Sequence, residues 1–144
     1  MDNALVEMYR SSDYRVRLPR GGWASIHIDA PLPASLLGLI GKHGWAFITA
    51  WNPFSRPLPR RQNHAAQQAL LAALRKLQST RLIRAAMGVG PSWRESSLFV
   101  VGPSLEEMDA LAQQFRQNAY IHGLGEGYAR LRLSSDQPPR GQAG

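Results

Sequence analysis

Residues 45–53 have the sequence Trp-Ala-Phe-Ile-Thr-Ala-Trp-Asn-Pro, and the fold can be worked out from this segment. Residues 45–51 are almost all apolar, so both faces of the segment suit burial, as in a central strand of a sheet. Asn52-Pro53 ends the segment, because proline has no N–H to donate to a strand ladder and the pair favours a turn. We therefore predict a buried strand over residues 45–51 and a turn after it.

A helix and two strands are expected next along the chain. Residues 62–78 carry apolar side chains at helical spacing, with strong helix formers between them. Residues 82–89 and 97–101 are typical of strands, and Gly90-Pro91 marks a turn between them.

A second helix is predicted from Ser104, because Ser104 and Glu107 have the spacing of a capping box. Its buried stripe would consist of Leu105, Met108, Leu111, Ala112 and Phe115. Residues 119–122 and 128–133 then indicate a hairpin around a glycine-rich turn.

The residues before position 45 predict additions to this core. Apolar residues alternate with polar ones over 14–18 and again over 24–28, and a Pro-Arg-Gly-Gly turn signal separates the two strands. A short helix is expected after Pro33, ending near Gly41 or Gly44.

The order of these elements predicts the fold class. From residue 45 it is strand, helix, strand, strand, helix, strand, with one more strand at the end. This βαββαβ order is that of a ferredoxin-like α+β sandwich, here with an extra C-terminal strand and N-terminal strand and short-helix additions. We expect a single domain over residues 1–133, in keeping with a length of 144 residues, and a disordered Pro/Gly/Gln-rich tail over 134–144.

Composition excludes several classes of site. The chain has no cysteine, which rules out disulfides, thiolate metal sites and a cysteine nucleophile, and suits a reducing cytoplasm. The four histidines are scattered without ligand spacing, so no metal is expected, and no cofactor motif is present. The N-terminus lacks the pattern of a signal peptide, and no apolar run is long enough to span a membrane. We expect a cytoplasmic protein.

The net charge of +7 comes almost entirely from arginine and raises the possibility of an anionic partner. Arg56, Arg60 and Arg61 lie in a proline-rich loop that leads into the helix over 62–78. These guanidinium groups define a nucleic-acid-binding alternative, although a solvated loop explains them equally well.

Polar residues gather where the strand over 45–51 ends. Thr49 and Trp51 share one face of that strand, and Asn52 and Ser55 stand at the turn. These groups suit a site for a small polar or anionic ligand, although local turn hydrogen bonds account for the same residues.

No recognised catalytic motif is present, so the chain is not assigned as an enzyme. Glu95 is one of few acids outside the predicted helices, and two roles are open for it, an acid–base group or a structural ion pair.

The sequence resembles a bacterial family of uncharacterised proteins known as domain of unknown function 3293. The resemblance covers about residues 45–133 and rests on a Thr-Ala-Trp-Asn-Pro-x-Ser string and a downstream Gln-Asn-Ala. It implies no activity, but it draws attention to a set of mostly polar positions: Thr49, Trp51, Asn52, Ser55, Asn63, Glu95, Gln117 and Asn118. Family members often have glycine where this chain has Arg116, so the turn before Gln117 is in question.

Three functions are therefore open. The first is a binding module in which these eight residues contact a small polar ligand, because neutral amides and hydroxyls orient a ligand without supplying chemistry. The second is nucleic-acid binding through the arginine-rich loop. The third is an enzyme with Glu95 as acid or base. The oligomeric state is not indicated by the sequence.

Overall fold

The predicted central strand is β3, Gly44–Ile48, and it lies between β5 and β6 in the sheet of an α+β fold. The structure, a computed structural model, describes residues 2–136. β3 ends at Ile48, three residues before the predicted end at Trp51, because the Thr49 side chain forms hydrogen bonds there in place of the backbone ladder. The Thr49 hydroxyl donates to Ser96 O at 2.7 Å and accepts from Trp51 N at 3.0 Å.

Seven strands form one antiparallel sheet in the order β2-β1-β4-β5-β3-β6-β7. The other strands are β1 Asp13–Arg17, β2 Trp23–Ile26, β4 Leu82–Val89, β5 Arg94–Val101, β6 Ala119–Leu124 and β7 Arg130–Leu133. All strands of the predicted set are present. β5 begins three residues earlier than predicted, so Glu95 lies inside a strand and not before it.

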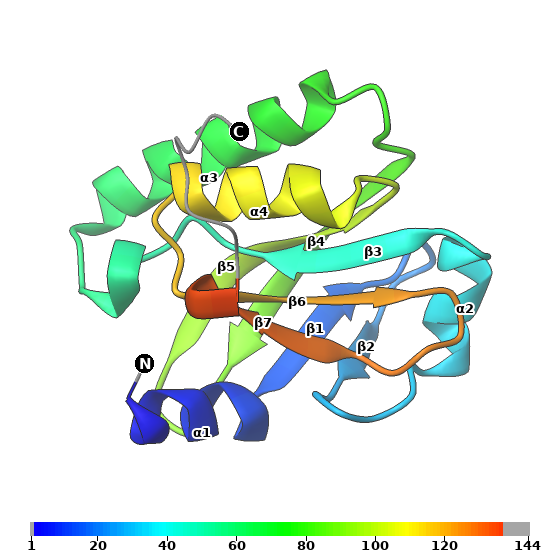
Figure 1. Cartoon of the computed structure of the whole chain (residues 1–144), viewed down its shortest axis with the longest axis horizontal. Coiled ribbons are helices and arrows are strands. Elements are labelled where there is room, and N and C mark those ends of the chain that lie inside the picture. The colour runs from blue at the N-terminus through cyan, green and yellow to red at the C-terminus, as the bar shows by residue number, and fades with distance from the viewer. Residues whose placement is uncertain (1, 137–144) are drawn as a thin grey trace.

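Helices α3, Arg60–Lys76, and α4, Leu105–Gln114, cover one face of the sheet (Figure 1). Their apolar stripes pack on β3, β5 and β6 and bury Leu70, Leu74 and Met108. The predicted capping box is confirmed, since Glu107 N donates to Ser104 Oγ and Ser104 N donates to Glu107 Oε1.

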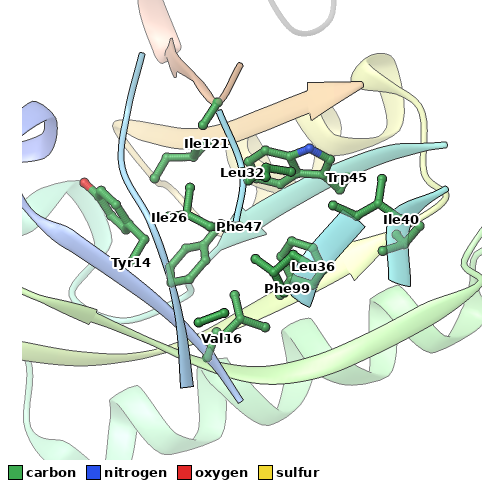
Figure 2. Close-up of a cluster of buried hydrophobic side chains, with 14 of the residues drawn as sticks. Tyr14, Val16, Ile26, Leu32, Leu36, Ile40, Trp45, Phe47, Phe99 and Ile121 are labelled. Carbon is green, nitrogen blue, oxygen red and sulfur yellow. The ribbon is translucent and has the colours of Figure 1, made fainter. Parts of the chain in front are cut away.

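The opposite face of the sheet curls around a second core, in which the aromatic and aliphatic side chains of several strands meet (Figure 2). Helix α2, Ala34–Ile40, lies at one end of the curl and buries Leu36 and Ile40 completely. The two outer strands are joined beyond their ends. Asp29 N donates to Ala129 O at 2.8 Å, and Ala129 N donates to Ala30 O at 3.0 Å.

A helix that the sequence analysis did not predict, α1 over Asn3–Ser11, lies at the other end of the curl from α2 (Figure 1). The Asp2 side chain caps it by accepting from Ala4 N. Leu5, Met8 and Tyr9 follow helical spacing and face the protein, but the stripe is too short to stand out in the sequence.

Residues 134–136, at the start of the segment expected to be a disordered tail, form a 3-10 turn, and the rest of that segment, 137–144, lies outside the described residues. Within residues 2–136, no helix has the length and apolar character needed to cross a membrane.

Candidate functional site

A pocket of about 280 Å³ opens at the α1 end of the curled sheet. Six parts of the chain form its wall: α1, β1, β3 with the loop after it, the β4–β5 hairpin, β6 with the segment that enters it, and β7. Six of the eight residues suggested by the sequence line it, namely Thr49, Trp51, Asn52, Ser55, Glu95 and Gln117. Asn118 contacts the pocket wall through Ser55, and Asn63 lies behind the loop.

The loop after β3 has a strained backbone. Asn52, Phe54 and Ser55 have φ values of 45°, 55° and 60°, in the left-handed region that non-glycine residues seldom adopt. Each such residue costs on the order of 1–3 kcal/mol, and clusters of them are typical of ligand sites. The loop must therefore be held in place by its surroundings.

Asn63 of α3 supplies much of that hold. Its side chain is 1% exposed. It accepts from Asn52 N at 2.8 Å and donates to Asn52 Oδ1 at 2.7 Å and to Leu58 O at 3.2 Å. All of these bonds run to the loop, so Asn63 positions the loop and has no contact with the 280 Å³ pocket.

Thr49 and Gln117 are also bonded within the protein. The Thr49 hydroxyl bonds to Ser96 O and Trp51 N, as described above. Gln117 is 7% exposed, and its Nε2 donates to Trp51 O at 3.3 Å and to Phe115 O at 3.2 Å. Both residues line the pocket while their polar atoms fix the course of its walls.

Glu95 differs from these residues because its carboxylate forms only a long, weak hydrogen bond with the described residues. Within residues 2–136, its one hydrogen bond is from Asn52 Nδ2, at a distance of 3.5 Å. No arginine, lysine or histidine among residues 2–136 forms an ion pair with it. Burial raises its pKa to about 7, although the Asn52 amide lowers it slightly. The structural ion pair that the sequence left open for Glu95 is not formed within the described residues.

Tyr9 of α1 joins the site, and the sequence analysis did not find it. Its hydroxyl lies 3.2 Å from Ser55 Oγ, which also accepts from Asn118 Nδ2 at 3.0 Å. Tyr14 Oη donates to Tyr9 O at 2.6 Å. Burial raises the pKa of Tyr9, and the charge of Glu95 adds to the shift. These bonds tie α1 to the strained loop across the mouth of the pocket.

Trp93 also lines the pocket, and the sequence analysis did not assign it to the site. Its ring lies against two glycines, Gly88 in β4 and Gly90 just after β4. A Cβ added to Gly90 would lie 1.9 Å from Trp93 Nε1, so only glycine leaves room for the ring there. The Nε1 donor is buried and has no partner within the described residues.

A second groove, of about 440 Å³, shares Trp51, Asn52 and Glu95 with the pocket and is also lined by Arg60 and Arg94. His64 of α3 stands edge-on to Trp51 in this groove, with ring centres 5.3 Å apart. Among the arginines proposed for nucleic acid, Arg60 therefore lies near the site. Arg56 and Arg61 are exposed and line neither the pocket nor the groove.

Arg116 has a φ of 55° and so takes the left-handed conformation that glycine adopts without strain. The turn before Gln117 thus keeps a glycine-like geometry despite the side chain. The Arg116 carbonyl accepts from Phe54 N at 2.7 Å, and this bond links the turn to the strained loop.

Comparison with known proteins identifies one family. Its model, described as a protein of unknown function (DUF3293), matches residues 48–120, which include every residue of the pocket except Phe47 and those from α1, β1 and the C-terminal strands. No curated protein matches the chain, and no solved structure matches it. Within residues 2–136, no group of three or more potential metal ligands is placed to hold an ion.

Proposed function

Because the chain belongs to this family of proteins of unknown function (DUF3293), whose description names no activity, we propose a function from the pocket itself: the protein binds a small polar molecule beneath α1. A volume of about 280 Å³ is at the lower edge of the roughly 300–1,000 Å³ typical of pockets for drug-sized ligands, which favours a small ligand.

The observation that carries the proposal has two parts. The loop after β3 has a strained backbone that is held by hydrogen bonds to Asn63 of α3, and beside it lies the Glu95 carboxylate, which has no ion-pair partner within the described residues. Three left-handed residues in four positions are costly, and Asn63 holds them without contacting the pocket. Such preorganisation is expected where a binding site must keep its shape when empty.

The roles of the eight candidate residues divide by their bonding. We assign Thr49, Asn63 and Gln117 to positioning, because their polar atoms bond to the protein itself. Ser55, Glu95 and Asn118 are assigned to contact with the ligand, with Trp51 as an apolar wall. Asn52 is assigned to both roles, because it lines the pocket while its Oδ1 accepts from Leu58 N and Asn63 Nδ2. To these we add Tyr9 and Trp93.

The test is a ligand-observed NMR screen of small polar compounds, with binders confirmed by thermal shift. Asn52→Gly keeps the left-handed backbone but removes the side chain, including the acceptor of Leu58 N and Asn63 Nδ2, so we expect it to fold with reduced stability and to lose binding. The control is Leu124→Ala, whose side chain is 69% exposed and does not line the pocket. Binders that tolerate Asn52→Gly and Ser55→Ala as well as they tolerate Leu124→Ala would refute the assignment.

Acid–base catalysis is a second candidate, favoured by the Glu95 pKa of about 7. A carboxyl group with this pKa exchanges protons readily at neutral pH, and Ser55 and Tyr9 line the same pocket. Any activity found in a substrate screen should disappear in Glu95→Gln. An activity that survives this change would remove Glu95 from the mechanism.

We further propose that the central part of the fold is ferredoxin-like. The strand order β4-β5-β3-β6, with α3 and α4 on one face, supports this assignment. The absence of cysteine supports a cytoplasmic location.

A further inference from the structure

We infer that the ligand of this pocket carries a positively charged amino or guanidino group, which pairs with the Glu95 carboxylate between aromatic side chains. The inference rests on the proposed function, namely that the pocket is a ligand site, and narrows the ligand to one chemical class.

The first argument is the missing partner of Glu95. The chain has seventeen lysines and arginines, yet none within residues 2–136 pairs with this half-buried acid. A carboxylate removed from water is costly unless it is paired and hydrogen-bonded. Its one internal bond, to Asn52 at 3.5 Å, is too long to compensate. A cationic ligand would supply both the charge and the missing donors.

The second argument is the character of the walls. Trp51 and Trp93 line the pocket, and Tyr9 and Tyr14 line it from α1 and β1. Burial raises the pKa of both tyrosines and the charge of Glu95, which lines the same pocket, adds to the shift. Aromatic faces attract ammonium and guanidinium groups, and a carboxylate among aromatic rings is a combination that selects cations.

The same arrangement disfavours an anionic ligand. An anion in the pocket would lie beside Glu95, where two carboxylates repel unless one is protonated. The nearby cations, Arg60 and Arg94, line the neighbouring groove and not the pocket. The anionic ligand considered from the sequence is therefore less compatible with the pocket than a cation.

Three matched probes test the inference: benzylamine, benzyl alcohol and benzoate, which are close in size and shape but differ in charge. Binding is measured by titration with NMR detection of the protein at near-neutral pH. We expect benzylamine to bind with a dissociation constant on the order of 1 mM, and the alcohol and the acid to bind at least about tenfold more weakly.

Substitution identifies the group responsible. Glu95→Gln keeps the shape of the side chain and removes its charge, so its dissociation constant for benzylamine should rise at least about tenfold. Arg94→Gln is the matched control, since it alters an adjacent charge on the same strand that lines only the groove.

The pH dependence gives a readout that a purely structural role of Glu95 does not produce. Because the pKa of Glu95 is about 7 and only ionised Glu95 attracts the ammonium group, benzylamine should bind several-fold to about tenfold more tightly at pH 8 than at pH 6. The other titratable or charged groups that line the pocket or the groove with Glu95 are Tyr9, Tyr14, Tyr120, His64, Arg60 and Arg94. The control His64→Asn, which changes a side chain of the groove, should leave the pH dependence unchanged, whereas Glu95→Gln should abolish it.

The outcomes separate this inference from the proposal beneath it. Equal or tighter binding of benzyl alcohol or benzoate, unchanged benzylamine binding in Glu95→Gln, or no binding of benzylamine would each overturn the cation assignment. The polar-compound screen with Asn52→Gly is independent of these probes and decides whether the pocket is a ligand site at all.

Discussion

Replacing Asn63 by alanine tests how the strained loop is held. The change removes an acceptor for Asn52 N and donors to Asn52 Oδ1 and Leu58 O, at 2.8, 2.7 and 3.2 Å. Each bond contributes about 0.5–1.5 kcal/mol, and the groups left behind are poorly solvated. Alanine recovers about 0.6 kcal/mol through its higher helix propensity. We expect a net loss of about 2–3 kcal/mol in the free energy of unfolding.

The assay is urea unfolding followed by circular dichroism, with thermal unfolding in parallel. For a chain of this length the loss corresponds to a fall in Tm of roughly 6–12 °C. Gln68→Ala on the exposed side of α3 is the control and should change stability by less than about 0.5 kcal/mol. A loss below about 1 kcal/mol in Asn63→Ala would show that the loop keeps its backbone without this side chain, and the positioning role would be wrong.

Four other substitutions give separate checks. Gly90→Ala should displace Trp93, lower the free energy of unfolding by about 1–3 kcal/mol and change the tryptophan fluorescence. By contrast, Gly38→Ala should raise the free energy of unfolding by up to about 1 kcal/mol, because Gly38 lies in helix α2 with open space at its Cβ. Arg116→Gly should raise the free energy of unfolding by about 0.5–1 kcal/mol by relieving the left-handed conformation, and no gain in urea unfolding would contradict the strain. The raised pKa of Glu95 means that the folded state binds more protons than the unfolded state between about pH 4.5 and pH 7. Burial of Glu95 should therefore lower the free energy of unfolding by a growing amount, up to about 3 kcal/mol, as pH rises through this range. The free energy of unfolding plotted against pH should be flatter for Glu95→Gln, and parallel curves for the two proteins would count against the shift.

Features encoded locally were predicted well from the sequence. The capping box at Ser104, the end of α2 at Gly41 and the turn at Asn52-Pro53 each depend on residues within a few positions of one another. The resemblance led us to expect a glycine where the chain has Arg116, and the positive φ of Arg116 is a backbone conformation that residues other than glycine adopt only under strain.

The parts that the sequence did not reveal depend on contacts between distant residues. Tyr9 and Ser55 are 46 positions apart, and no local pattern predicts that a short N-terminal helix will cover the loop. The same holds for Trp93, which became part of the site because β5 begins at Arg94 and two glycines admit its ring. The polar candidates taken from the family resemblance lie in one region of the structure, but the resemblance could not separate Asn63, which bonds to the loop, from Glu95, which lines the pocket.

The hydrogen bonds that join Asp29 and Ala30 to Ala129 have a consequence for association between molecules. Sheet edges normally present unpaired N–H and C=O groups, on which another chain can add a strand and begin aggregation. Here the segments that follow β2 and precede β7 use some of those groups on each other. The ion pair between Asp29 and Arg130 adds charge beside this closure. The curl that shapes the pocket thus also reduces the length of free edge that a second chain could extend.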